Sequence, residues 1–257
     1  MNILCIGDVV GEAGCTQLAR HLPALKRLKA VDLTIVNGEN SEGFAGISPR
    51  SAERIFKAGA DIITTGNHAF RCSDVYSSFE ENEFLLRPAN YPSTAPGRGM
   101  GIFDMGRQRV CVINLMGVVY MESLKPPFEA AEELLAQVPK DVKVIIIDFH
   151  AEATSEKKAL AYHLDGRASA IFGTHTHVQT ADEQILPKGT GFITDAGMTG
   201  PINSVLGVAP ELAVSKLRDK LPVRFKPAEG ECMLNGILFE IEQKTGLCTA
   251  VERIALQ

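Results

Sequence analysis

VKVIIIDFH, residues 142–150, is a run of apolar and β-branched residues that closes with an aspartate, a phenylalanine and a histidine. It shows almost no alternation between apolar and polar side chains. This pattern is typical of a strand that is buried on both faces, as in the parallel sheets of α/β proteins. The run therefore predicts an internal strand with His150 at its carboxyl end.

Six other runs have the same apolar, β-branched character: ILCIG (3–7), LTIVNG (33–38), DIITTG (61–66), RVCVINL (109–115), ASAIFG (168–173) and GFITDAG (191–197). Helix-like stretches lie between them at 15–29, 48–59 and 127–138, the second with a Ser-Pro start and a glycine stop. The alternation of the two patterns predicts an α/β fold, with one mixed sheet or two sheets.

Residues 232–256 differ from the rest of the chain. They form two alternating segments joined by a Lys-Thr-Gly turn, which predicts a β-hairpin. No linker, repeat or low-complexity stretch interrupts the sequence. We therefore expect a single domain that spans residues 1–257.

The composition excludes several classes of protein. With 45% hydrophobic and 22% charged residues the chain is of ordinary globular type, and its net charge of −5 gives no basic surface for stable binding of duplex nucleic acid. The N-terminus reaches Asp8 after a few apolar residues, so neither a signal peptide nor a membrane span is expected there. Six scattered cysteines without a C-x-x-C pair indicate the reducing cytoplasm.

Polar side chains follow five of the predicted strands. Ligands of open α/β sheets bind at the carboxyl ends of the strands, so these side chains are expected to converge on one rim. In chain order they are Asp8, then Glu39 and Asn40, then Asn67 and His68, then His150, and finally His175 and His177.

The last pair lies in FGTHTHVQT, residues 172–180. A helix would point side chains at i and i+2 away from each other, whereas an extended segment or a tight loop can turn both imidazoles the same way. The segment by itself is compatible with a metal site and equally with a polar loop that contains two histidines.

Taken together, the strand ends offer two carboxylates, two amide carbonyls and three imidazoles as ligands, with His68 beside them. Seven oxygen and nitrogen ligands exceed the needs of one four-coordinate zinc, but they suit two ions that share a bridging carboxylate. The lack of thiolates favours manganese, iron or zinc in a hydrolytic role. The glycines of GDVVGEAG do not have the G-x-G-x-x-G spacing, so a dinucleotide cofactor is not expected.

Five motifs, in their order and spacing, resemble those of the calcineurin-like metallophosphoesterases, and most closely the bacterial YmdB-like branch: GDVV (7–10), NGEN (37–40), GNHAF (66–70), DFHAE (148–152) and GTHTH (173–177). FHAEATSEK (149–157) and TDAGMTGP (194–201) fit the same branch, so the resemblance covers essentially the whole chain. It implies a metallophosphoesterase fold, in which two packed mixed β-sheets form a sandwich flanked by α-helices, with a dinuclear site at one edge.

The resemblance also implies the ligands of each metal. Asp8, Glu39, Asn40 and His177 would hold one ion, and Glu39, Asn67, His150 and His175 the other, with Glu39 bridging. Two departures from the wider superfamily are visible: its D-x-H motif is Asp8-Val9-Val10 here, and its bridging aspartate is Glu39. Asn40 is expected to replace the missing histidine ligand. Ala69 stands where an acidic residue usually follows G-N-H, so the sequence leaves open what orients His68.

The implied function is a phosphodiesterase with two iron or manganese ions, or zinc, acting on 2',3'-cyclic or 3',5'-cyclic nucleotides such as cyclic AMP. A hydroxide that bridges the metals would attack phosphorus, and His68 would be the general acid. Two alternatives stay open: a metal-dependent phosphomonoesterase, and a metal-binding regulatory or scaffold protein with incidental turnover. Self-association is also left open, and the candidates for lining the substrate pocket are Asp195, Thr199 and Asn203.

Overall fold

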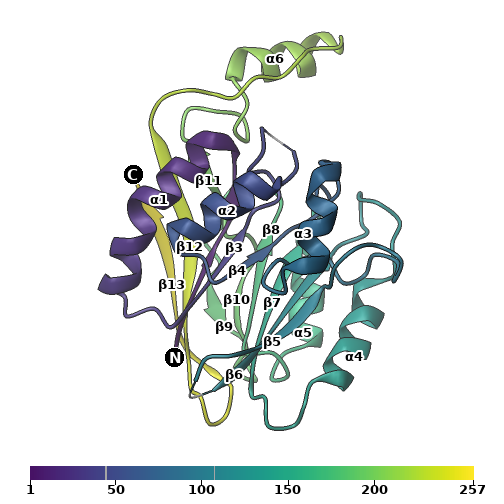
Figure 1. Cartoon of the computed structure of the whole chain (residues 1–257), viewed down its shortest axis with the longest axis vertical. Coiled ribbons are helices and arrows are strands. Elements are labelled where there is room, and N and C mark those ends of the chain that lie inside the picture. The colour runs from purple at the N-terminus through teal and green to yellow at the C-terminus, as the bar shows by residue number, and fades with distance from the viewer. Residues whose placement is uncertain (44, 107) are drawn as a thin grey trace.

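A computed structural model describes residues 1–43, 45–106 and 108–257 of the chain. Its centre is a sandwich of two mixed β-sheets, and helices cover both outer faces (Figure 1). The metallophosphoesterase-type sandwich that the sequence predicts is thus confirmed. A single domain over residues 1–257 stays a prediction.

The first sheet has the order β2-β11-β12-β1-β3-β4. The long strand β12 pairs with β11 at Cys232 and Met233 and with β13 from Leu234 onward. Strands β1, β3 and β4 are parallel to one another, and β12 is antiparallel to β1 and β13. The strands of this sheet are β1 (Asn2–Ile6), β2 (Asp8–Val9), β3 (Leu33–Asn37), β4 (Ile62–Thr64), β11 (Met198–Pro201), β12 (Cys232–Ile241) and β13 (Cys248–Leu256).

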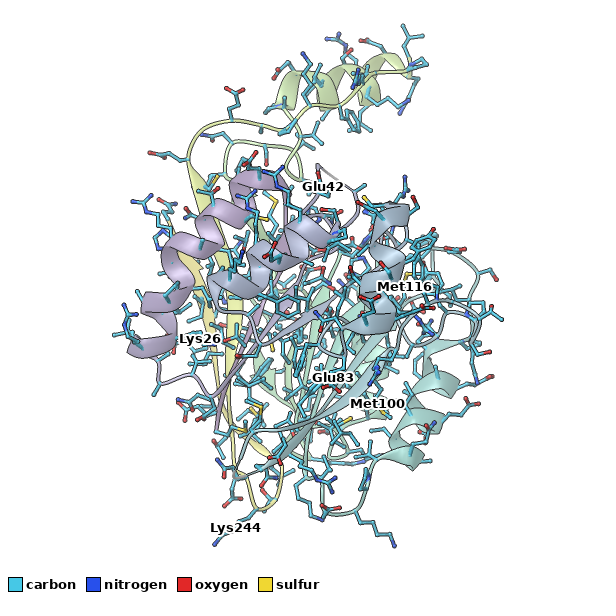
Figure 2. All side chains as sticks on the ribbon, viewed as in Figure 1. Lys26, Glu42, Glu83, Met100, Met116 and Lys244 are labelled. Atoms are coloured by element: carbon cyan, nitrogen blue, oxygen red, sulfur yellow. The ribbon has the colours of Figure 1, made fainter. Side chains whose placement is uncertain are left out.

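The second sheet has the order β5-β6-β7-β8-β10-β9. Its four inner strands are parallel, and the two edge strands are antiparallel to their neighbours. The strands are β5 (Met100–Asp104), β6 (Arg109–Met116), β7 (Val144–His150), β8 (Ala170–Thr174), β9 (Gln184–Ile185) and β10 (Gly191–Ile193). Met116, labelled in Figure 2, ends β6 and pairs with His150 at the end of β7.

The run at 142–150 is mostly apolar, without alternation between apolar and polar residues, because both faces of β7 are covered. Val144 and Ile146 pack in the layer between the two sheets, together with Ile3 and Cys5 of β1. The residues that alternate with them, such as Ile147, pack against the helices of the outer layer. The parallel pairing of β7 with β6 and β8 places its carboxyl end, at His150, beside the ends of those two strands.

The helices form the outer layers. On the first sheet lie α1 (Gly11–Leu28), α2 (Pro49–Ala58) and the short α3 (Tyr76–Glu81), which follows a 3₁₀ turn (Ser73–Val75). On the second sheet lie α4 (Pro127–Gln137) and α5 (Thr154–His163). Helix α6 (Pro210–Asp219) protrudes from the sandwich, at the opposite end of the molecule from Lys244 in the hairpin turn (Figures 1 and 2). No helix in the described residues has the length and apolar character of a membrane span.

Every predicted strand and the C-terminal hairpin are present, but the helix predicted at 15–29 begins earlier, at Gly11. The glycines of its first turn allow close packing rather than breaking the helix. A Cβ atom at Gly14 would lie 2.3 Å from the carbonyl oxygen of Thr199, so only glycine lets α1 approach β11. The three predicted helices do not include α3, α5 or α6. On α6, Val214 and Leu217 are 51% and 63% exposed, so its apolar residues do not form a stripe facing the core.

Candidate metal centre

The eight predicted site residues lie together at one edge of the sandwich, where the carboxyl ends of several strands meet. Asp8 is in β2, and His150 is the last residue of β7. The other six follow β3, β4 and β8 in the chain. Each of the eight side chains is within hydrogen-bond or ion-pair distance of another member of the set: Asp8, Glu39, Asn40, Asn67, His68, His150, His175 and His177.

Glu39 lies in the middle of the group and is completely buried. Its Oε1 atom is 3.0 Å from Asn40 Nδ2 on one side and 3.2 Å from His150 Nε2 on the other. Its Oε2 atom accepts a hydrogen bond of 3.2 Å from the backbone N–H of His68. The carboxylate therefore joins the two groups of ligands that the sequence predicts.

Asp8 is also completely buried, and one of its carboxylate oxygens lacks a donor. Oδ2 accepts a hydrogen bond of 3.0 Å from the backbone N–H of His175. Oδ1 is 3.7 Å from His177 Nε2 and has no hydrogen-bond partner among the described residues. A buried carboxylate oxygen without a donor is costly, and a bound cation would remove that cost.

The tightest cluster consists of Glu39, His150 and His175, whose ligand atoms all lie within 4.8 Å of one another. His175 Nδ1 is 3.0 Å from His150 Nε2, and the two rings meet edge to face with centroids 4.8 Å apart. Asn67 Oδ1 is 3.0 Å from the same His150 nitrogen. Imidazole nitrogens and carboxyl or amide oxygens facing one point suit manganese, iron or zinc.

The ionisable groups of the centre shift one another's pKa values. Burial would lower the pKa of His150, but the Glu39, Asp8 and Asp148 carboxylates outweigh burial and raise it. Burial would likewise raise the pKa of Glu39, but His150 and His68 hold it below its ordinary value. Burial, helped by His150, lowers the pKa of His175 to about 3, so that imidazole is neutral and able to bind a metal.

The backbone after β8 explains how both histidines of GTHTH reach the centre. His175 and His177 have φ angles of 104° and 64°, in the left-handed region that side chains other than glycine rarely adopt. Each such residue costs on the order of 1 to 3 kcal/mol. The segment is therefore a tight, strained loop, and it places the two imidazoles on the same side.

A hydrogen-bond chain behind His150 fixes which nitrogen faces the centre. His150 Nδ1 is 2.9 Å from Thr174 Oγ1, and that hydroxyl donates to Asp148 Oδ1 at 2.8 Å. Because the Thr174 hydroxyl donates its proton to Asp148, it accepts a hydrogen bond from His150 Nδ1–H. The other ring nitrogen, Nε2, is then the one that can bind a metal. The sequence gives no signal for this role of Thr174, because it depends on the pairing of β7 with β8.

Asn40 orients His68, which answers the question raised by Ala69. Asn40 Oδ1 is 2.7 Å from His68 Nδ1, while Asn40 Nδ2 is 3.1 Å from His177 Nε2. The Asn40 amide therefore orients the His68 imidazole, as an acidic residue at position 69 would in the wider superfamily. In this orientation the amide nitrogen of Asn40 faces His177, so ligation of a metal by Oδ1 requires the amide to turn.

Two further residues complete the centre and were not predicted. The backbone carbonyl of Leu206 is 3.1 Å from His177 Nδ1, which directs His177 Nε2 toward Asp8. Gly66 leaves the space that the centre fills, because a Cβ atom there would lie 2.2 Å from His150 Cδ2 and 2.3 Å from Glu39 Oε2. Its position before Asn67 in GNHAF is the only sequence signal for Gly66.

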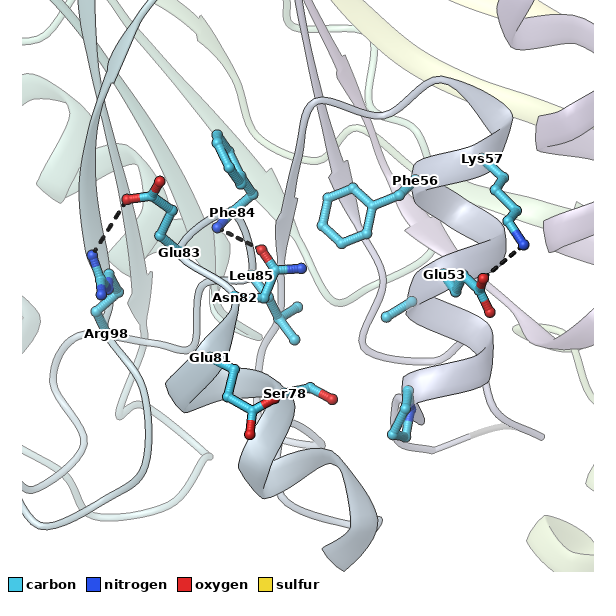
Figure 3. A pocket seen from close by; sticks show the side chains of 12 residues that line it. Glu53, Phe56, Lys57, Ser78, Glu81, Asn82, Glu83, Phe84, Leu85 and Arg98 are labelled. Atoms are coloured by element: carbon cyan, nitrogen blue, oxygen red, sulfur yellow. Dashed lines mark hydrogen bonds and ion pairs between the residues drawn. The ribbon is translucent and has the colours of Figure 1, made fainter.

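A groove of about 590 Å³ between α2 and α3 is a separate feature (Figure 3). Phe56 and Phe84 line it, and four of its charged residues form pairs, Glu53 with Lys57 and Glu83 with Arg98. None of the eight candidate residues lines this groove in the described part of the chain. The groove is therefore separate from the candidate ligands at the rim of the sandwich.

The comparison with known protein families identifies the chain. The sequence model of the family of YmdB-like proteins matches residues 4–254 of the chain. The chain belongs to the YmdB-like family. The family that the five motifs predict is thus confirmed.

Relatives in this family include a 2',3'-cyclic-nucleotide 2'-phosphodiesterase of Bacillus subtilis (strain 168), which is 44% identical over 256 residues. The match covers 100% of this chain and 97% of the relative. A phosphatase from Mycoplasma pneumoniae has a similar structure, with a TM-score of 0.94 and 34% identity over 100% of this chain and 93% of its own. A protein of Thermus thermophilus has a TM-score of 0.93 and 38% identity over 99% and 98% of the two chains.

The geometry around Gly66 predicts a specific defect in the variant Gly66→Ala. The added methyl group must displace His150 and Glu39, so metal content measured by elemental analysis should fall, and the melting temperature should drop by the equivalent of about 1 to 3 kcal/mol. Gly200→Ala is the control, because a Cβ there comes no closer than 3.2 Å to a neighbour. Wild-type metal content in a folded Gly66→Ala protein would contradict the proposed packing of the centre.

Proposed function

We propose that this YmdB-like chain is a metal-dependent phosphodiesterase that uses a dinuclear centre to hydrolyse 2',3'-cyclic and 3',5'-cyclic nucleotides. One observation carries the proposal: a buried carboxylate, Glu39, joins two groups of nitrogen and oxygen ligands. The identity of 44% with a 2',3'-cyclic-nucleotide 2'-phosphodiesterase over the whole chain supports the choice of substrate.

The residues present fit two cations. Asp8 and His177 would hold one ion, completed by Asn40 after its amide turns, and Asn67, His150 and His175 would hold the other. Glu39 would be shared by both. Two buried carboxylates together with three imidazoles suit iron or manganese, with zinc as the third choice. When bound, the two ions would activate a water molecule as nucleophile and offset charge on the phosphoryl oxygens.

His68 is suited to donate a proton to the leaving oxygen. Its Nδ1 faces the Asn40 amide, through Oδ1 in the orientation described and through Nδ2 after the amide turns, so Nε2 is the nitrogen available to a substrate. Its side chain is 21% exposed. Burial lowers the pKa of His68, although the Glu39 carboxylate opposes that effect. A lower pKa makes the imidazolium a stronger acid, which favours transfer of its proton to an alkoxide.

A phosphomonoesterase is the second candidate. The observation that favours it is the likeness to the Mycoplasma pneumoniae phosphatase, at a TM-score of 0.94 and 34% identity. The same ligands would serve either reaction, because both begin with attack of an activated water on phosphorus. The two reactions differ in the size of the substrate and in its leaving group.

The shared position of Glu39 predicts different metal losses in two variants. Glu39→Ala should lose metal from both positions, because it removes the ligand that both ions share, whereas His177→Ala should weaken mainly one. Elemental analysis of protein purified without chelators measures both, with His163→Ala as a control histidine on α5 that pairs with Glu132. Full occupancy in Glu39→Ala would exclude the bridging role.

The substrate class predicts an order of catalytic efficiencies. With manganese or iron, kcat/KM should be higher for cyclic nucleotides and bis-esters than for monoesters with the same leaving group, and a chelator should abolish all turnover. Higher efficiency on monoesters would support the second candidate instead. Metal binding without multiple turnovers on any ester would indicate a regulatory or scaffold protein.

The role of His68 predicts an effect that depends on the leaving group. His68→Ala should keep near-normal metal content and lose on the order of 10²- to 10⁴-fold in kcat on a 2',3'-cyclic nucleotide, whose alkoxide needs a proton. The loss should be much smaller on bis(p-nitrophenyl) phosphate, because nitrophenolate leaves without a proton. Equal losses on both substrates would argue against acid catalysis, and loss of metal would make His68 a ligand.

A further inference from the structure

A buried ion pair lies directly behind the strained histidine segment. Lys157 of α5 and Asp195, which follows β10, are joined by a contact of 2.8 Å between Nζ and Oδ2. The side chain of Lys157 is 1% exposed and that of Asp195 is 0% exposed. Asp195 therefore does not line an open substrate pocket, contrary to the expectation from the sequence.

Lys157 is tied to the end of β8 as well as to Asp195. Its Nζ atom donates a hydrogen bond of 2.8 Å to the carbonyl oxygen of Thr174, the residue whose hydroxyl accepts from His150. The stem of the lysine fits tightly against the strand, because a Cβ atom at Gly173 would lie 3.0 Å from Lys157 Cδ. The ammonium group is thus held at one place under the strand end.

Asp195 holds the loop between the two histidines. Its Oδ2 atom accepts hydrogen bonds from the backbone N–H of Thr176 at 3.0 Å and from the Thr176 hydroxyl at 2.8 Å. Its Oδ1 atom accepts a third, of 2.9 Å, from the backbone N–H of Gly197. Thr176 lies between His175 and His177, so the carboxylate anchors the segment at its centre.

Two unfavourable features meet at this segment. A buried ion pair costs desolvation energy, and apolar residues of similar volume often stabilise a fold as well or better. The positive φ angles of His175 and His177 persist only where surrounding contacts determine them. Lys157 and Asp195 contact Thr174 and Thr176, the two residues on either side of His175, and so can contribute to that constraint.

We infer that Lys157 and Asp195 are positioning residues, which hold His175 and His177 in the geometry that metal binding needs. The pair acts through Thr174 and Thr176 and does not itself reach the centre. This inference rests on the proposed function, since it treats both histidines as metal ligands. It assigns to the ion pair a role in metal affinity rather than in the stability of the fold.

The test compares Lys157→Met with Lys158→Met in the full-length chain. Lys158 is the neighbouring residue on α5, but its side chain is 42% exposed and its partner is Asp182 at 3.3 Å, so it is a matched control. Calorimetry with Mn²⁺ on metal-stripped protein should show affinity lower by about 10- to 100-fold in Lys157→Met. Affinity in Lys158→Met should equal that of the wild type.

A second measurement does not depend on bound metal. The imidazole nitrogen NMR signals of His175 and His177 in metal-free protein, assigned with His175→Gln and His177→Gln, should shift or broaden in Lys157→Met and stay unchanged in Lys158→Met. If Lys157→Met does not fold, the double variant Lys157→Met/Asp195→Asn removes both buried charges, and the same results are expected.

Unchanged Mn²⁺ affinity and unchanged imidazole signals in either folded variant would overturn the inference, even if the melting temperature falls, because a purely structural role would produce that result. A wild-type protein that binds no Mn²⁺, iron or zinc would instead count against the proposed function. In that case the metal-free NMR signals still decide whether the ion pair positions the histidines.

Discussion

The burial of the Glu39 carboxylate, with Asp8 close by, is the constraint on which the rest of the centre depends. Two acids that are 0% exposed need positive or hydrogen-bonding partners, since burying unpaired charge is costly. Within the chain, the His150 imidazole, whose pKa these carboxylates raise, and donors from Asn40 and His68 meet this need. The same arrangement is suited to replacement of the proton by metal ions.

The sandwich makes this burial achievable. Strands β1, β3 and β7 are covered on both faces, so most of their side chains are used for packing, and the polar groups of the candidate site lie at or beyond the carboxyl ends of strands. The parallel neighbours β3 and β4 in one sheet, and β7 and β8 in the other, end at the same rim. Gly66 then leaves room for His150 and Glu39 to meet across the two sheets.

Much of the fold and of the candidate site could be predicted because it follows from local pattern. The apolar run at 142–150 indicates a strand covered on both faces, and the polar residues that follow such runs mark the rim. The start of α1 could not be predicted, because the glycines that normally end a helix here allow contact with β11. The orientation of Asn40 and the role of Thr174 could not be predicted either, since both depend on hydrogen bonds between distant segments.

The sequence by itself determined which runs form the main strands, which polar side chains follow those strands and which family the chain belongs to, because these depend on residue type and spacing. Only the tertiary structure decided how those side chains are oriented and supported. Lys157 and Lys158 show the difference most clearly, because they are the same residue at adjacent positions of α5. One is 1% exposed against β8 and the other 42% exposed. Their roles differ because successive residues of a helix point about 100° apart, so packing against the strand selects one of them.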